Sequence, residues 1–259
     1  TEAARQLART MGIELVRIDP DTLEVRFSVI GSELWSDDPG FETSIRAFGV
    51  TGICGSGIIE AVAEMFLSSI ISEDGVIDGS LAERSERLIP EDRTWSFLLH
   101  DGKQRIVVTQ NDVRQIQLAK AALYAGVRLL LDRAGIDHVD RIRLAGAFGS
   151  HIDPRYAMVL GLVPDCDLEK VESAGNAAGT GARIALLNVT SRDEIESVVR
   201  RIEKIETAVE PMFQEYFVNA MAIPHKVDRF PKLAKIVNMP KATQVKGKIK
   251  RRRGHRKIR

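Results

Sequence analysis

Hydrophobic positions along the chain repeat with two different periods, and together they predict an α/β protein. Apolar residues alternate with polar ones over 141–144 and over 19–30, which predicts two strands. They recur with helical spacing over 112–134, 192–207 and 211–224, which predicts amphipathic helices. We therefore expect a mixed sheet flanked by helices, with the apolar faces of the last two helices packed against the rest of the protein.

The longest predicted helix, 112–134, carries an apolar stripe and a flank of small residues that another helix can approach. The stripe consists of Val113, Ile116, Leu123, Val127 and Leu130, and the flank of Ala119, Ala122 and Gly126. The polar side of this segment includes Gln110, Asp112, Gln117 and Lys120. These polar side chains either reach the ribose of a nucleotide or face solvent, and the spacing alone leaves both interpretations open.

Other segments give weaker signals. Residues 1–15 predict a helix or an irregular start, and residues 31–40 predict a loop. Residues 81–105 mix charged and aromatic side chains and predict a hairpin. We place this hairpin on a smaller subdomain at roughly 65–108.

The strand over 141–144 ends in a turn of small residues that contains Gly146 and Gly149. Glycine carries no Cβ and tolerates positive φ, so the backbone N–H groups of such a turn can approach a ligand closely. In α/β sheets, ligands bind at the carboxyl ends of the strands. The start and stop signals of the helix that follows are Asp153, Pro154 and Gly161. By itself, this turn also fits a tight strand-to-helix connection without a ligand.

A second cluster, Gly52 to Gly57, opens a predicted helix. Free N–H groups and the positive end of a helix dipole suit a phosphate or a ribose, although no GK[ST] sequence follows and the cluster is not a P-loop. For Cys54 we favour a small buried hydrophobe over a nucleophile, because no His is nearby in the sequence. We expect Glu60 on the first helical turn, where a carboxylate favours the dipole.

A third cluster begins at Gly175, and Asn176 can cap a helix whose first turns contain Gly179 and Gly181. Glycine within a helix costs up to about 1 kcal/mol relative to Ala. Two glycines therefore indicate either a hinge against a second lobe or a tight contact between helix and strand.

The composition, 44% hydrophobic and 28% charged, is typical of a globular protein. No apolar run approaches the roughly 20 residues that span a bilayer, so we expect a cytoplasmic protein without a membrane partner. The chain contains two cysteines, Cys54 and Cys166, outside any CxxC spacing. They exclude a disulfide framework and a four-cysteine iron–sulfur cluster built from this chain alone.

Charge is distributed unevenly. Residues 241–259 contain ten Lys or Arg and no acidic residue, which leaves 27 basic against 36 acidic residues, a net charge of −9, over residues 1–240. A basic tail can bind nucleic acid or another anionic surface, but this one has no aromatic residue to stack on bases. We expect 236–259 to form a basic, disordered tail and do not expect nucleic acid as a partner.

Three glycine clusters at the starts of helices are typical of a bilobal nucleotide-binding fold, and four ordered segments carry a more specific resemblance. These segments are TGICGSGIIEAVAE (51–64), VVTQNDVRQIQLAKAALYAGV (107–127), RIRLAGAFGSHID (141–153) and GNAAGTGARIALLN (175–188). From about Glu14 to Pro231, the chain resembles the actin-like ATPase domain of the reductive activators of corrinoid proteins. That family belongs to the superfamily of sugar and acetate kinases, heat-shock chaperone ATPases and actin.

The resemblance implies an α/β, actin-like (ribonuclease H-like) ATPase lobe over 1–235 that binds ATP or ADP with Mg²⁺. Leu144–Gly149 resembles the loop that contacts the adenosine, Gly52–Gly57 a loop near the nucleotide, and Gly175–Gly181 the second connecting helix. The candidate nucleotide-binding residues are Gly52, Gly55, Ser56, Gly57, Glu60, Gln117, Lys120, Gly146, Ala147, Phe148 and Gly149. The candidate hinge residues are Asn176, Gly179 and Gly181. No catalytic residue and no metal ligand is assigned.

Two parts of the family pattern have no counterpart in this sequence. Family members carry an N-terminal ferredoxin domain with a two-iron two-sulfur cluster, and their Asp-Gly-Thr-type phosphate loops lie upstream of the matched region. We therefore expect an ATPase domain that is incomplete at its N-terminus and that hydrolyses ATP poorly or not at all by itself.

By resemblance, the whole protein returns an oxidised Co(II) corrinoid protein to Co(I), coupling ATP to electrons from the ferredoxin-type domain. The expected partner is the corrinoid protein of a methyltransferase or O-demethylase system, and a homodimer is compatible with this function. Two alternatives stay open, a small-molecule kinase of the same superfamily and a non-enzymatic docking module.

Overall fold

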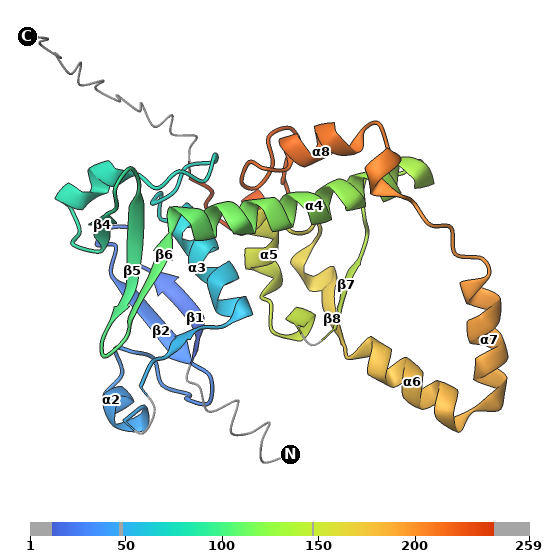
Figure 1. The fold of residues 1–259 in the computed structure, drawn as a ribbon, viewed down its shortest axis with the longest axis horizontal. Helices are drawn as coiled ribbons and strands as arrows, with labels where there is room; N and C mark the ends of the chain where they lie inside the picture. The colour runs from blue at the N-terminus through green and yellow to red at the C-terminus, as the bar shows by residue number, and fades with distance from the viewer. Residues whose placement is uncertain (1–11, 47–48, 147, 241–259) are drawn as a thin grey trace, which may run out of the picture.

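The computed structural model describes residues 12–46, 49–146 and 148–240, which form a body with a projecting arm (Figure 1). The strands are β1 (Gly12–Ile18), β2 (Val25–Val29), β3 (Gly52–Ile53), β4 (Leu88–Pro90), β5 (Trp95–Asp101), β6 (Arg105–Thr109), β7 (Ile142–Ala145) and β8 (Val171–Gly175). The α-helices are α2 (Phe41–Ser44), α3 (Gly55–Leu67), α4 (Gln110–Ala134), α5 (Pro154–Leu160), α6 (Ala177–Leu187), α7 (Val189–Val199) and α8 (Phe213–Asn219).

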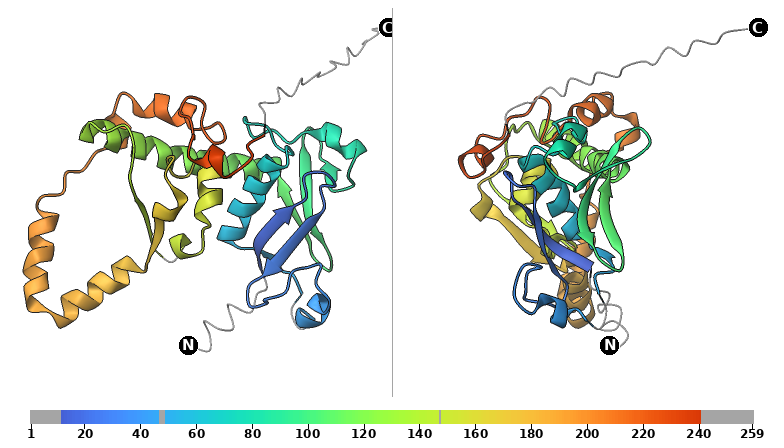
Figure 2. Two further views of the ribbon diagram at one scale, coloured as in Figure 1. Left: turned by 180° about the vertical axis from the view of Figure 1, so that it is seen from behind. Right: turned by 90° about the vertical axis from the view of Figure 1, so that its left-hand side faces the viewer.

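The described strands form three small sheets. In the first sheet β1 lies between β2 and β3, antiparallel to β2 and parallel to β3. In the second β5 lies between β4 and β6, antiparallel to both, and the third pairs β7 with β8 in parallel. Helix α3 packs on β1, α5 on α3, and α8 on α4. Helix α4 runs along the body, with α8 on one side and α3, α5 and β7 on the other (Figures 1 and 2).

The strands predicted over 19–30 and 141–144 are present as β2 and β7. The prediction of a helix at the start was wrong for residues 12–15, which belong to β1; residues 1–11 lie outside the described residues. A hairpin explains the difference, because β1 pairs with β2 across a turn in which Asp19 Oδ1 accepts the N–H groups of Asp21 and Thr22 at 2.9 and 2.8 Å. The hairpin predicted over 81–105 is part of the three-stranded sheet β4-β5-β6.

Helix α4 confirms the longest predicted helix, but the predicted stripe is only partly buried: Val113 is buried and Ile116 packs against the core. It begins with a capping box, in which Thr109 Oγ1 accepts the Asp112 N–H at 3.1 Å and Asp112 Oδ2 accepts the Thr109 N–H at 2.9 Å. Leu123 and Leu130 of the stripe are exposed, whereas Lys120 is buried. Neither α4 nor any other helix in the described segments is long and apolar enough to cross a membrane.

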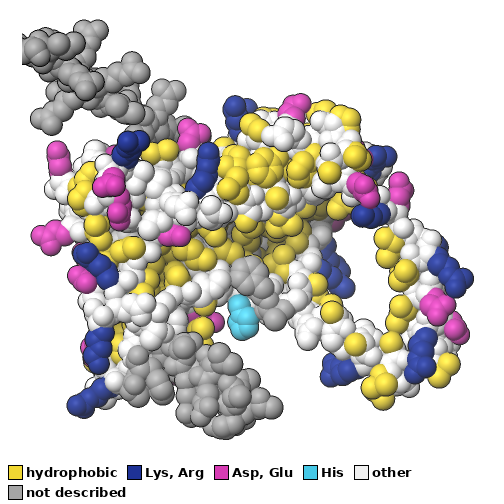
Figure 3. Space-filling model, viewed as in Figure 1, with side chains coloured by type: hydrophobic (Ala, Val, Ile, Leu, Met, Phe, Trp, Pro, Cys, Tyr) yellow, Lys and Arg dark blue, Asp and Glu magenta, His cyan; other side chains and the backbone are white. Residues whose placement is uncertain are grey.

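Helices α6 and α7 form an arm that projects from the body (Figure 1). The predicted packing of 192–207 was wrong for the described structure, in which the arm carries exposed apolar side chains (Figure 3). Large apolar residues of the arm that are at least two-fifths exposed are Ile184, Leu186, Leu187, Val189, Ile195, Val198 and Val199, and Ile202 just beyond α7 is exposed as well. The helix predicted over 192–207 is present as α7 only up to Val199, and residues 200–206 are not helical. Helical spacing of apolar residues therefore predicted part of the helix but not whether its apolar face is buried.

The start of the predicted tail over 236–259 belongs to the folded body. Val237 is buried, and Met239 packs against the core. Residues 241–259 lie outside the described residues, so the prediction of a disordered basic segment there stays a prediction.

Helix α3 approaches β1 closely because Gly57 has no side chain. A Cβ built at Gly57 would lie 2.3 Å from Ile13 O and 3.0 Å from Ile53 Cγ1. The Cys54 N–H donates to the same Ile13 carbonyl at 2.9 Å. The first turn of α3 therefore rests directly on the backbone of β1.

Replacing Gly57 with Ala should destabilise the protein by about 2 kcal/mol, because the new methyl group would overlap a backbone oxygen of β1. Gly126→Ala is the matched control. No described atom lies within 4 Å of a Cβ built at Gly126, in the interior of α4. The free energy of unfolding of this variant should therefore rise by about 0.5–1 kcal/mol. Chemical denaturation measures both changes. A Gly57→Ala variant as stable as the parent would contradict the close contact.

Candidate functional site

The first glycine cluster forms the start of α3, as predicted, with Cys54 as its N-cap residue. Cys54 Sγ accepts the Gly57 N–H at 3.3 Å and lies 3.0 Å from Ser56 Oγ. Cys54 is half-buried, so the favoured interpretation as a buried hydrophobe was wrong: the thiol serves as a polar cap. The N–H groups of Gly55 and Ser56 precede the first intrahelical hydrogen bond, from Ile58 to Cys54 O at 3.0 Å.

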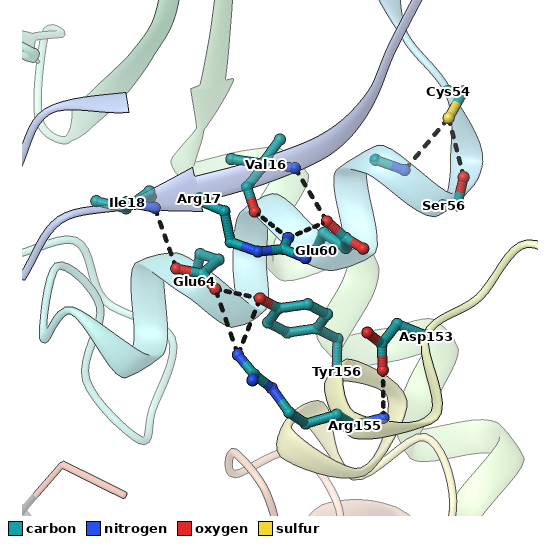
Figure 4. Close-up of polar contacts among 11 residues, drawn as sticks. Val16, Arg17, Ile18, Cys54, Ser56, Glu60, Glu64, Asp153, Arg155 and Tyr156 are labelled. Atoms are coloured by element: carbon teal, nitrogen blue, oxygen red, sulfur yellow. Dashed lines mark hydrogen bonds and ion pairs between the residues drawn. The ribbon is translucent and has the colours of Figure 1, made fainter. Parts of the chain in front are cut away.

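Glu60 does not lie on the first turn, because α3 begins at Gly55. Its side chain is 3% exposed, and its Oε2 accepts the Val16 N–H at 2.9 Å and Arg17 Nη1 at 2.7 Å (Figure 4). Burial raises the pKa of Glu60, while the hydrogen bond from Val16 and the Arg17 guanidinium oppose this shift. Glu60 therefore joins α3 to β1 in this structure, and a contact with nucleotide stays a prediction.

Glu64 repeats this contact one turn later on α3. Its Oε2 accepts the Ile18 N–H at 3.1 Å, and its Oε1 accepts the hydroxyl of Tyr156 from α5 (Figure 4). Tyr156 is fully buried, and burial together with the bond to Glu64 raises its pKa. Arg155 Nη2 lies 3.8 Å from Glu64 Oε1. We did not identify Glu64 and Tyr156 from the sequence; two Glu four residues apart on an otherwise apolar helix were the available signal.

The second glycine cluster follows β7, as predicted. Gly146 has φ +104, the left-handed region that favours glycine. The helix signals are confirmed, since Asp153 Oδ1 accepts the Arg155 N–H at 2.7 Å and Gly161 ends α5 with φ +72. Ala147 and the side chain of Phe148 lie outside the described residues.

The third cluster follows β8 and meets the second. Asn176 Oδ1 accepts the Gly179 N–H at 2.9 Å and caps α6, as predicted. The Gly146 N–H donates to Gly175 O at 2.8 Å, and so joins the two clusters. Among described residues, nothing lies within 4 Å of a Cβ built at Gly181. The alternative of a tight helix–strand contact therefore fails at Gly181, and the hinge stays a prediction.

Contacts with β1 bring the first two clusters near each other. Gly57 of the first packs on Ile13, and His151, which follows the second, has its Nδ1 3.8 Å from Oε1 of the adjacent Glu14. Cavities of about 720 Å³ beside Phe27 and about 470 Å³ beside Gln117 lie away from these turns. The structure thus joins the second and third turns by a hydrogen bond and connects the first two through β1, while a nucleotide-sized cleft between them stays a prediction.

Gln117 and Lys120 are not solvated, contrary to one of the two interpretations. They are 2% and 1% exposed. Gln117 Nε2 donates to Met221 O at 2.9 Å, and Lys120 Nζ donates to Ala222 O and, at 2.7 Å, to Pro224 O. Burial lowers the pKa of Lys120 to about 7. Both side chains hold residues 221–224 against α4, and contact with a ribose stays a prediction.

The candidate residues present no metal centre. Within 12–46, 49–146 and 148–240, no group of three or more His, Cys, Asp or Glu side chains could hold a metal ion. Mg²⁺ is commonly held by one or two carboxylates together with the phosphates of a nucleotide, so the expectation that this chain supplies no metal ligand stays a prediction. The glycine turns and the N-terminus of α3 suit an anion or a sugar.

A family described as the C-terminal domain of RACo, the ASKHA domain, matches residues 4–234. The chain belongs to this family. The match confirms the resemblance drawn from the four ordered segments and the predicted actin-like α/β fold. The limits placed on the ASKHA domain at 1–235 and on its small subdomain at 65–108 stay predictions.

Two relatives are similar over most of this ASKHA domain. Corrinoid activation enzyme RamQ of Eubacterium limosum is 37% identical over an alignment of 184 residues, and the match covers 66% of this chain and 31% of RamQ. The solved structure of a reductive activator for corrinoid, iron–sulfur protein matches with a TM-score of 0.70 and 32% identity, and the match covers 84% of this chain and 33% of that one. The chain thus spans about a third of the length of each relative.

The buried Lys120 should make the stability of the ASKHA domain depend on pH. Its pKa is about 7 in the folded chain and 10.5 when unperturbed, so between these values the unfolded chain binds one proton more than the folded chain. The free energy of unfolding should then rise with pH by up to about 1.4 kcal/mol per unit.

Lys120→Met should remove this slope. We would compare the two proteins by urea denaturation from pH 7 to pH 10, and the difference between their profiles isolates Lys120 from other titrating groups. If the free energies of unfolding of the two proteins changed in parallel with pH, Lys120 would keep its proton in the folded protein throughout this range.

Proposed function

We propose that this chain is the nucleotide-binding portion of an ATP-dependent reductive activator that returns a Co(II) corrinoid protein to Co(I). The observation that carries the proposal is the family match over residues 4–234. The names of both relatives agree with it, since one is a corrinoid activation enzyme and the other a reductive activator for corrinoid, iron–sulfur protein. Neither name points to a small-molecule kinase or to a docking module without activity.

Within this proposal, the chain binds nucleotide and other segments carry electrons. The two cysteines of the sequence cannot hold a four-cysteine cluster, so a ferredoxin-type domain with a two-iron two-sulfur cluster would supply the electron. By the resemblance to the family, the phosphate loops and the ligands of Mg²⁺ would also come from other segments. Gly52–Gly57 and the turn at Gly146 would face the adenosine.

Nucleotide binding would act by shifting a conformational equilibrium. Two lobes that close on ATP would favour the conformation of the activator in which the corrinoid protein is bound and reduced. The shift cannot exceed the difference between the affinities of ATP for the two conformations. The partner in this scheme is the corrinoid protein of a methyltransferase or O-demethylase system in the cytoplasm, and the activator would work as a monomer or a homodimer.

Gly146→Val should weaken nucleotide binding at least tenfold, because the valine side chain would occupy space next to the turn that we propose faces the adenosine. Gly135→Val is the matched control. Gly135 also has positive φ, +67 against +104, and a Cβ at either position meets no described atom within 4 Å. Both variants therefore carry backbone strain, but Gly135 lies at the end of α4, outside the candidate site.

Isothermal titration calorimetry with ADP and ATP, with and without Mg²⁺, measures the affinities. We would titrate the 259-residue chain and the longest natural polypeptide that contains it. Equal affinity in the Gly146→Val and Gly135→Val variants would contradict the role of the turn. Absence of nucleotide binding by the longer polypeptide would overturn the proposed function, and phosphorylation of a sugar or an acid by that polypeptide, without a corrinoid protein, would favour a kinase.

A further inference from the structure

Helices α3 and α5 each follow a glycine cluster, and they pack against each other. Helix α3 begins within the first cluster, at Gly55, and α5 begins at Pro154, shortly after Gly149. A shift of one helix relative to the other would therefore change the spacing between the two turns. What holds α3 and α5 together sets the geometry of the candidate site.

A buried polar contact crosses this interface. Tyr156 of α5 is fully buried, and its hydroxyl donates to Glu64 Oε1 of α3, whose side chain is 8% exposed (Figure 4). The second oxygen of Glu64 accepts the Ile18 N–H at 3.1 Å. One carboxylate thus joins α5, α3 and β1. A hydrogen bond of this kind fixes direction and distance more strictly than apolar packing does.

Both turns also contact the same short stretch of β1, but only the first is held there by backbone. Gly57 packs on the carbonyl of Ile13, and His151 lies 3.8 Å from Glu14. The first of these contacts involves rigid backbone, whereas the second joins two side chains of which His151 is 64% exposed. The bond from the Gly146 N–H to Gly175 O holds the second turn to β8 at 2.8 Å. Its position relative to the first turn, by contrast, depends on α5 and, through Tyr156, on Glu64.

We propose that Tyr156 and Glu64 are positioning residues that hold the glycine turns before α3 and α5 at the spacing a nucleotide requires. The proposal rests on the proposed nucleotide-binding function and assigns neither residue a contact with nucleotide. The Tyr156 hydroxyl acts on the site through the α3–α5 interface. Removing it would leave Glu64 Oε1 without its buried donor and free α5 to shift.

The chain offers a matched control. Tyr124 on α4 is 2% exposed, and its hydroxyl donates to Asp228 Oδ2 at 2.9 Å. It is therefore a second buried tyrosine bonded to a carboxylate, but it joins α4 to residue 228 instead of joining α3 to α5. Tyr156→Phe and Tyr124→Phe remove the same atom from similar surroundings, so a general loss of stability should appear in both.

Amide hydrogen exchange of the 259-residue chain without ligand tests the positioning role directly. In Tyr156→Phe we expect exchange at the amides of Gly57 and Gly146 to accelerate at least fivefold, while Tyr124→Phe changes both less than twofold. Thermal unfolding of both variants shows whether they remain folded. Equal exchange at these amides in the two variants would overturn the proposal, whatever the affinity for nucleotide.

Calorimetric titration with ADP then tests the consequence for the site. We would titrate the longest natural polypeptide that contains the chain. If the parent binds, Tyr156→Phe should weaken binding at least fivefold and Tyr124→Phe less than twofold. Equal affinities in the two variants would overturn the positioning role but leave the proposed function intact. A parent that does not bind would overturn the proposed function, and hydrogen exchange alone would then decide whether Tyr156 holds the turns.

Discussion

The structure depends on two buried carboxylates of α3 that bind the backbone of β1. Glu60 and Glu64 accept the N–H groups of Val16 and Ile18, which point to the same edge of the strand. A buried carboxylate is costly unless donors surround it. Here each carboxylate has a backbone N–H and a side-chain donor, from Arg17 or Tyr156. The glutamates therefore occupy part of a strand edge where another strand would otherwise pair, and they fix α3 to the sheet.

Helix α4 uses the opposite chemistry for the same purpose. Lys120 and Gln117 are buried donors, and their acceptors are the carbonyl groups of residues 221–224, which come from the distant C-terminal part of the chain. The same loop meets α5, since a Cβ built at Gly161 would lie 2.1 Å from Pro224 O. Segments far apart in sequence are thus joined by polar contacts in which a side chain binds backbone.

These contacts place the elements that carry the glycine turns. The turns are connected to one another through the Gly146–Gly175 hydrogen bond and through β1, on which Gly57 rests and which His151 contacts at Glu14. We propose a nucleotide as the ligand of these turns, because the chain belongs to the ASKHA family and is similar to corrinoid activators. The chain spans about a third of those relatives, and its described residues offer glycine turns at or near the starts of helices. Both observations agree with the proposal that this chain supplies one part of a nucleotide site.

The sequence by itself determined the local features: the helix α4 over most of its length, the start and end of α5, and the glycine turns, because each depends on neighbours in the chain. Four ordered segments also sufficed for the family. Only the tertiary structure decided which polar residues are buried. Glu64 and Lys120 look solvated by their residue type, and their partners at Ile18 and Pro224 lie 46 and 104 residues away. Periodicity cannot show such partners. Burial of a polar or ionisable side chain costs free energy unless folding brings hydrogen-bond donors or acceptors to it, and those partners come from distant parts of the chain.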